Sequence, residues 1–236
     1  MRLLLLHGLG GNAGVWDGVA RQFDGEVIAP DLAGHGNAAP IEHYDFDHHA
    51  RDLLERLGTV LADAPFFAIG HSLGGATAIA LAALAPNLPI RGIVAVGVKT
   101  FWPPEDVAVM HRIADKGTGT FPDFDSGAAR FLRVSGREGL AATRAAVVRR
   151  GLRRVDGQWR LAVDPEAYRI SPAPLSKVLA RVDCPVIMAS GEHDPMAPPA
   201  SLAPLGRPVV TVPGVGHNAH VEAPAAILDL LEGLVR

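Results

Sequence analysis

A serine stands between an apolar run and a helical run in FFAIGHSLGGATAIALAALAP, residues 66–86. Ser72 is the centre of GHSLG, residues 70–74, which fits the pattern G-x-S-x-G. So tight a turn from strand to helix leaves almost no room for side chains two residues either side of the serine, and both positions are glycine. The hydroxyl would then stand clear at a helix N-terminus, where the Leu73 amide and the helix dipole favour negative charge. The pattern indicates a nucleophile; the alternative is a serine that only caps a helix.

A serine nucleophile needs a general base, and the base needs an acid that orients it. His217 lies in a glycine-bracketed loop within VTVPGVGHNAHVEAP, and Asp194 lies in the loop of PVIMASGEHDPMAPP. Both loops follow apolar runs, and the chain order Ser, Asp, His is that of a known hydrolytic triad. We therefore predict that Ser72 is the nucleophile, His217 the general base and acid, and Asp194 its orienting partner.

Other acids and histidines compete for these roles. Glu192 lies earlier in the same loop, and Asp183 precedes the strand, at the wrong end of the sheet. His217 could be an ordinary loop histidine, and Asp194 could be a turn-former before a proline. His220 lies where the next helix should begin, so we expect it on a helix face.

The loop after the first apolar run could supply the other half of an oxyanion hole. In LLLLHGLGGNAGVW, residues 3–16, closely spaced glycines let the backbone approach a substrate oxygen. We predict that the amides of Leu9 and Leu73 are the two donors. The alternative is a phosphate-binding loop, but the glycine register fits that fingerprint only in a relaxed form. That fingerprint also expects an acidic residue after the next strand, and the acid at this place is Asp31 in APDLAGHG.

Short apolar runs alternate with amphipathic segments, which predicts a doubly wound α/β fold with a mostly parallel sheet of about six strands. The predicted strands cover residues 2–6, 26–30, 66–70, 90–98, 185–190 and 208–213. A helix is predicted over 45–64, with Leu53, Leu54, Leu57, Val60 and Leu61 on one face. Ser72, Asp194 and His217 all follow carboxyl ends of strands, where open α/β sheets build their sites.

One long region breaks this alternation. Residues 99–179 carry no strong signal for a parallel strand, and GQWRLAV (157–163) is at most a short, isolated β run. We predict a mainly helical insertion over 99–179, carried by a core of residues 1–98 and 180–236.

Composition limits the class of protein. The chain has 236 residues, 48% of them apolar and 20% charged, with a net charge of −3, which is typical of a soluble globular protein without nucleic-acid partners. No apolar run approaches the roughly 20 residues of a membrane span, and the four leucines near the start are too few for a signal peptide. Cys184 is the single cysteine, so no intramolecular disulfide is expected. We expect a cytoplasmic protein without membrane partners.

The ten histidines contain no H-E-x-x-H or H-x-H-x-D-H pattern. We therefore expect no metal and no cofactor.

Taken together, these motifs resemble the α/β-hydrolase-fold family of capped serine hydrolases. The resemblance rests on HGLG (7–10), PDLAGHG (30–36), GHSLGG (70–75), SGEHDPM (190–196) and GVGHNAHVEAP (214–224). It implies the same triad and oxyanion donors, a structural turn at Asp31, Gly34 and Gly36, Trp16 bordering the active site, and a substrate-shaping cap over 99–179. The first two strands of many relatives have no counterpart here. The shorter sheet would leave an exposed edge, so we expect a monomer or a weak homodimer.

The cap should shape the substrate pocket. The apolar candidates for the pocket wall are Trp102, Phe121, Phe124, Met110 and Met196, or these side chains simply pack the cap against the core. The arginines of the cap are Arg130, Arg133, Arg137, Arg144, Arg149, Arg150, Arg153 and Arg154. They form either a solvated face or contacts with an anionic substrate such as a carboxylate, a coenzyme A thioester or an acyl carrier.

Three functions follow from this resemblance and these residues. The first is hydrolysis of a carboxylic ester, lactone or thioester of a small molecule through an acyl-enzyme on Ser72. The second is a carbon–carbon hydrolase or lyase that acts on an anionic diketone-type or acyl substrate with the same triad. The third is a receptor-like binding protein with slow turnover.

Overall fold

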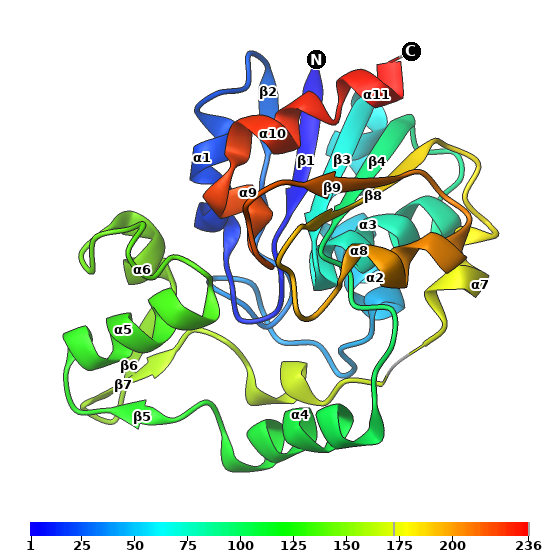
Figure 1. Cartoon of the computed structure of the whole chain (residues 1–236). Helices are drawn as coiled ribbons and strands as arrows, with labels where there is room; N and C mark the ends of the chain where they lie inside the picture. The colour runs from blue at the N-terminus through cyan, green and yellow to red at the C-terminus, as the bar shows by residue number, and fades with distance from the viewer. Residues whose placement is uncertain (172, 236) are drawn as a thin grey trace.

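A six-stranded parallel sheet forms the centre of the molecule in the computed structural model, which describes residues 1–171 and 173–235 (Figure 1). The strand order is β2-β1-β3-β4-β8-β9, and every neighbouring pair is parallel. In that order the strands are Glu26–Ile28, Arg2–Leu6, Phe66–His71, Ile90–Val96, Val186–Gly191 and Val209–Val212. The predicted fold class is confirmed, and each predicted strand forms within two residues of its expected bounds.

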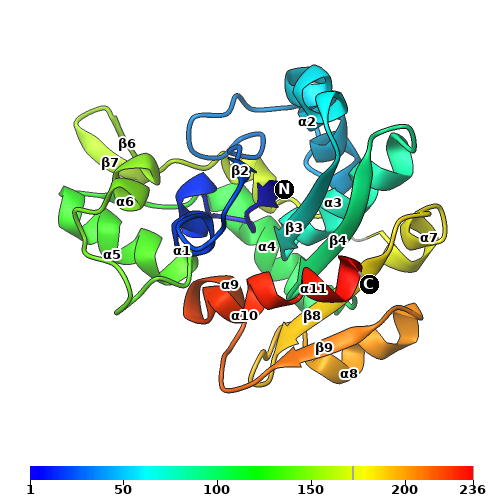
Figure 2. The same ribbon diagram turned by 90° about the horizontal axis from the view of Figure 1, so that it is seen from above.

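Successive side chains of a strand point to opposite faces of a sheet, and β1 shows this directly. Leu3 and Leu5 are buried in the core of one face, whereas Leu4 and Leu6 are buried in the core of the other. The first face is covered by η1 (Ala13–Trp16), α1 (Asp17–Ala20), α9 (Ala219–Glu222), α10 (Pro224–Asp229) and α11 (Glu232–Val235) (Figure 2). The second is covered by α2 (Phe46–Asp63), α3 (Leu73–Leu84), α7 (Leu175–Leu179) and α8 (Pro199–Leu202), which runs into η3 (Ala203–Leu205).

Helix α2 begins and ends as its sequence predicts. Asp45 caps it by accepting the backbone N–H of His48 at 2.8 Å. Leu53 and Leu61 are fully buried, but Val60, which was predicted on the same face, is 44% exposed.

An insertion between β4 and α7 lies beyond the carboxyl ends of the strands and is coloured green to yellow in Figure 1. It consists of α4 (Pro104–Lys116), β5 (Thr120–Phe121), α5 (Phe124–Val134), α6 (Ala146–Arg150), β6 (Leu152–Val155), β7 (Gln158–Leu161) and η2 (Pro165–Tyr168). Helix α7 also falls within the predicted cap range, but Leu175 and Leu179 pack in the core beneath α3.

The insertion contains a small antiparallel sheet of order β5-β7-β6. Strand β7 pairs with a neighbour on each side, so the prediction of an isolated β run is wrong. Asp156 and Gly157 form the two-residue turn between β6 and β7, with φ angles of 51° and 79°. Two successive positive φ values mark a type I′ turn, for which Asp-Gly is a preferred sequence.

Cys184 is half-buried and forms no disulfide, and burial raises the pKa of its thiol. No helix in the described ranges, 1–171 and 173–235, has both the length and the apolar character that a membrane span requires.

Candidate active site

The corner between β3 and α3 presents Ser72. Its backbone has φ 50° and ψ −114°, a conformation that residues with a side chain rarely adopt. A Cβ atom at Gly70 would clash with the carbonyl of Gly74, and one at Gly74 would clash with the carbonyl of Leu6. The corner therefore requires glycine on both sides of the serine, as the spacing of the motif predicted.

His217 and Asp194 come together from the loops that follow β9 and β8. Nδ1 of His217 lies 2.9 Å from Oδ2 of Asp194, and Oδ1 of Asp194 accepts the backbone N–H groups of Met196 and Ala197 at 2.8 and 3.0 Å. Burial alone would raise the pKa of Asp194, but the His217 hydrogen bond and these amides outweigh it and lower the pKa. Because an ionised carboxylate only accepts, Nδ1 carries the proton and Nε2 is left as the basic nitrogen.

The rival acid Glu192 has a different partner. Its carboxylate accepts the backbone N–H of Gly214 at 2.9 Å and is about half exposed. Asp183 is exposed and precedes β8, at the opposite end of the strand from His217.

Two buried histidines support the loop that carries His217. His71 donates its Nε2 proton to the carbonyl oxygen of His217 at 2.9 Å, and its ring stacks on His220 at a centroid distance of 4.2 Å. Burial lowers the pKa of His71 well below its ordinary value and lowers that of His220 to about 3, so both rings are neutral. His220 does lie on a helix, α9, but packs inward against Trp16, at a centroid distance of 4.6 Å.

The glycine loop after β1 is fixed by another buried histidine. His7 accepts the N–H of Leu32 on Nε2 at 2.9 Å and donates from Nδ1 to the carbonyl of Gly8 at 2.8 Å. Burial lowers the pKa of His7 to about 3, which keeps this neutral form. Across the described residues, neither the N–H of Leu9 nor that of Leu73 has an acceptor, and both residues line the cavity that holds Ser72.

Asp31 has a structural task in the turn after β2. Its two carboxylate oxygens accept the N–H groups of Ala13 at 2.8 Å and Asn37 at 2.9 Å. Gly34 and Gly36 have φ angles of 71° and 55° in the same turn. An acid engaged in this way is not free to hold a ribose, so the turn does not support the phosphate-loop alternative.

A cavity of about 430 Å³ lies between the sheet and the insertion, and both Ser72 and His217 line it. Three predicted wall residues, Trp102, Met110 and Met196, line it as well. The other lining residues are Leu9, Tyr44, Asp45, Phe46, His71, Leu73, Ala76, Val98, Lys99, Ile113, Arg130, Arg133, Val134, Ala167, Tyr168, Ile170, Ser171 and Asn218. Tyr168 and Asn218 were not predicted, since no motif in the sequence marks them.

Three predicted pocket residues lie outside this cavity. Trp16 is fully buried in the core. Phe124 packs its ring edge-on against Trp159 at 5.1 Å, and Phe121 lies beside Gly127 on α5. Both phenylalanines pack against the buried cluster that contains Phe131 and Leu152 of the insertion, and a sequence pattern cannot distinguish that packing from a pocket wall.

Both connections between the sheet and the insertion pass this cavity. The outgoing chain lines it at Val98 and Lys99, and the returning chain lines it at Ile170 and Ser171. Lys99 pairs with Asp106 of α4 and lies over the ring of Trp102 at 4.6 Å.

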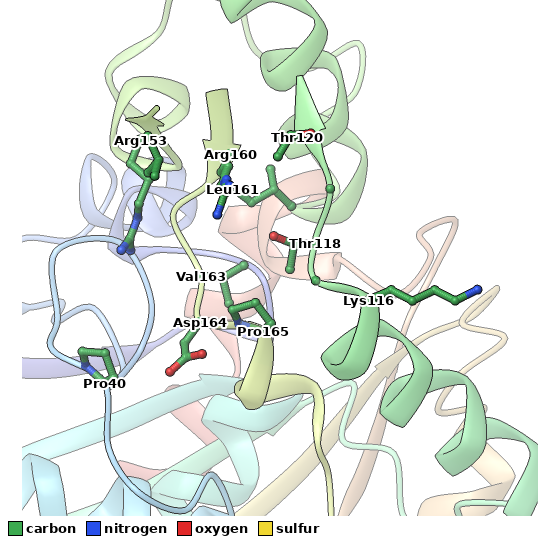
Figure 3. A pocket seen from close by; sticks show the side chains of 13 residues that line it. Pro40, Lys116, Thr118, Thr120, Arg153, Arg160, Leu161, Val163, Asp164 and Pro165 are labelled. Carbon is green, nitrogen blue, oxygen red and sulfur yellow. The ribbon is translucent and has the colours of Figure 1, made fainter. Parts of the chain in front are cut away.

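A second cavity, of about 520 Å³, lies within the insertion and holds none of the predicted catalytic residues. Figure 3 shows Arg153 and Arg160 extending toward it from β6 and β7, whereas Lys116 points away. Neither a serine nor a histidine is among the residues that line it. In the described part of the chain, no three His, Cys, Asp or Glu side chains gather closely enough to hold a metal ion.

Comparison with known proteins places this geometry in a family. The model of the alpha/beta hydrolase family matches residues 3–230. The chain belongs to this family. Its relatives include esterase Rv0045c of Mycobacterium tuberculosis, 28% identical over 99% of this chain and 82% of that protein. They also include 2-(acetamidomethylene)succinate hydrolase of Mesorhizobium japonicum, 26% identical over 99% of this chain and 87% of that protein.

Solved structures agree with this assignment. The crystal structure of E-2-(acetamidomethylene)succinate hydrolase superposes with a TM-score of 0.81 at 25% identity, over 99% of this chain and 90% of that chain. The crystal structure of esterase Rv0045c superposes with a TM-score of 0.78 at 27% identity, over 100% of this chain and 84% of that chain. The protein is therefore an alpha/beta hydrolase enzyme.

Proposed function

We propose that this hydrolase cleaves carboxylic esters or related acyl bonds, including lactones and thioesters, through Ser72, His217 and Asp194. The observation that carries the proposal is the 2.9 Å hydrogen bond between His217 and Asp194, on the same cavity as a serine in a constrained corner. A buried, ionised Asp194 orients the imidazole, which leaves Nε2 to accept a proton.

The reaction runs in two halves. Nε2 of His217 takes the Ser72 proton as the hydroxyl oxygen attacks the acyl carbon. The oxyanion receives hydrogen bonds from the free amides of Leu9 and Leu73. The leaving group departs with the proton from His217, and an acyl-serine remains. Water then attacks this ester and gives a proton to His217, which passes it to the Ser72 oxygen as the carboxylic acid is released.

The experiment is hydrolysis of p-nitrophenyl esters from acetate to decanoate. Ser72→Ala should lower kcat by roughly 10⁴–10⁶-fold, since removal of a triad nucleophile has effects of that size. Ser171→Ala is the matched control, because Ser171 also lines the cavity but has no place in the mechanism. Full turnover in Ser72→Ala would overturn the proposal. The preferred chain length would report the depth of the cavity.

A second candidate is hydrolysis of an anionic acyl substrate such as a substituted succinate. The relative named 2-(acetamidomethylene)succinate hydrolase favours it, as do the two arginines, Arg130 and Arg133, that line the Ser72 cavity. It predicts poor turnover of neutral esters and Ser72-dependent release of product from a dicarboxylate.

A further inference from the structure

Arg130 differs from the other arginines of the insertion in its surroundings. Most of them have partners: Arg137 with the carbonyls of Gly14 and Val15, Arg144 with Asp125, Arg149 with the carbonyl of Arg144, Arg150 with Asp31, Arg153 with the carbonyl of Gly36, and Arg169 with Asp115 and Glu166. Arg130 is half-buried on α5, lines the Ser72 cavity, and forms no hydrogen bond or ion pair with any described residue. Its guanidinium is therefore free to pair with an anionic group that enters the cavity.

Tyr168 supplies a second unused donor in the same cavity. The residue is only 8% exposed, yet its hydroxyl has no hydrogen-bond partner within residues 1–171 and 173–235. The hydroxyl lies beside the glycine loop, 2.8 Å from where a Cβ atom on Gly10 would be. Tyr168 is thus next to Leu9, whose amide is one of the proposed oxyanion donors.

The two donors act in one electrostatic environment. Burial raises the pKa of Tyr168, and the nearby positive charge of Arg130 opposes that rise. The phenol of Tyr168 therefore stays protonated at neutral pH and can donate a hydrogen bond near the positive charge of Arg130.

Two other charged groups of the cavity, Asp45 and Lys99, already have partners. Asp45 is bound to the backbone N–H and the ring of His48, both at 2.8 Å, and Lys99 is paired with Asp106. Arg133, one turn from Arg130 on α5, adds a second positive charge to the wall without an ion pair to any described residue. The cavity thus has an excess of positive charge around an apolar pocket.

We propose that Arg130 and Tyr168 form a subsite for a carboxylate of the substrate, so that the hydrolase acts on acyl compounds that carry a second, free carboxylate. This inference rests on the proposed function, because Ser72 must attack the acyl carbon while the carboxylate is held. A guanidinium and a hydroxyl together give charge-assisted hydrogen bonds to one anionic group. A neutral analogue would leave both donors unpaired. A site whose polar groups are left unpaired by the wrong substrate discriminates strongly against that substrate.

The test uses two substrates matched in size: mono-4-nitrophenyl glutarate, which is anionic, and its methyl ester, which is neutral. We expect kcat/KM of the wild type to favour the anionic ester by roughly 10–100-fold, the effect of charge-assisted hydrogen bonds. Arg130→Met keeps most of the side-chain volume and should reduce that ratio to near one, chiefly through KM. Tyr168→Phe should reduce it several-fold, and Arg130→Lys should restore part of it.

Arg154→Met is the matched control. Arg154 is an exposed arginine of β6 that lines neither cavity and has no partner within the described residues, so its removal should leave the ratio at the wild-type value. A ratio near one in the wild type, or a ratio that Arg130→Met leaves unchanged, would overturn the subsite.

Failure of the proposed function would be recognisable separately. If the wild type hydrolyses neither ester, titration calorimetry with glutarate still tests the subsite. Glutarate that binds the wild type and Arg154→Met at least tenfold more tightly than it binds Arg130→Met supports the subsite, and equal affinities overturn it.

Discussion

The backbone of Ser72 holds a residue with a side chain where glycine would fit more easily. Its φ of 50° and ψ of −114° lie outside the regions that side chains favour, and such residues cost on the order of 1–3 kcal/mol. The corner keeps this conformation because β3 and α3 fix it from both sides. The strain places the hydroxyl at the cavity rather than in the hydrogen bonding of the helix.

This strain predicts different stabilities for two substitutions of Ser72. Ser72→Gly should be more stable toward urea than Ser72→Ala by about 1 kcal/mol, because glycine relieves the strain and loses only part of that gain to chain entropy. Urea unfolding followed by circular dichroism measures the difference. Equal midpoints for the two variants would mean that Ser72 is not strained.

Among single residues, the sequence identifies those whose role can be recognised from the residues next to them in the chain. Ser72 lies between obligatory glycines, and His217 and Asp194 follow strands whose ends meet. His71 and Tyr168 could not be found in this way. Their surroundings come from segments distant in the chain, such as the His71 contact with His217, 146 residues away.

Among the elements, the β6–β7 hairpin depends on its two-residue turn. Gly157 has a φ of 79° and Asp156 a φ of 51°, and the turn pairs Val155 with Gln158. Asp-Gly between two short strand-like segments is a recognised hairpin signal, so this hairpin could have been predicted from the sequence. The parallel strands were easier to predict because each coincides with a short, almost wholly apolar run.

Two glycine-to-alanine substitutions separate turn glycine from helix glycine. Gly157→Ala should destabilise the protein by about 1 kcal/mol, because alanine is strained at positive φ. Gly58→Ala, in the middle of α2 with open space around its Cβ position, should stabilise it by about 0.5–1 kcal/mol. Urea midpoints of both variants check this, and a shift of the same sign in both would contradict it.

The pocket residues of the insertion could be predicted only in part. Phe124 and Trp102 are both aromatic residues of the insertion, yet Phe124 packs edge-on against Trp159 and Trp102 lines the cavity. Which side an aromatic ring faces depends on how α4 and α5 sit over the sheet. That arrangement is a property of tertiary packing rather than of local pattern.

Among the described residues, five histidines are buried in the interior: His7, His35, His49, His71 and His220. Burial lowers the pKa of each of them, to about 3 for His7, His49 and His220. The unfolded chain, with histidine pKa values near 6.5, therefore binds more protons below that pH than the folded chain does. The stability from these histidines is complete above pH 6.5 and is lost as the pH falls.

This difference predicts cooperative acid unfolding at roughly pH 5. Each histidine whose pKa falls to about 3 costs about 1.4 kcal/mol per pH unit below 6.5, and His7, His49 and His220 together reach the lower end of the total stability of an ordinary domain, about 5–15 kcal/mol. His49→Leu should lower the acid midpoint, because both ring nitrogens of His49 lack partners within the described residues. The exposed His43→Leu should not. Circular dichroism against pH measures the midpoints, and a protein still folded at pH 4 would contradict the prediction.

The cavity lies where the chain passes twice between the sheet and the insertion, at Val98–Lys99 and at Ile170–Ser171. A molecule that fills the cavity would touch both crossings as well as Ser72, and it would therefore hold the insertion against the sheet. Binding free energy then adds to the cohesion of the two parts for as long as the site is occupied. In the proposed mechanism, an acyl group on Ser72 would keep the two parts together until deacylation, so the cohesion of the molecule would rise and fall with each turnover.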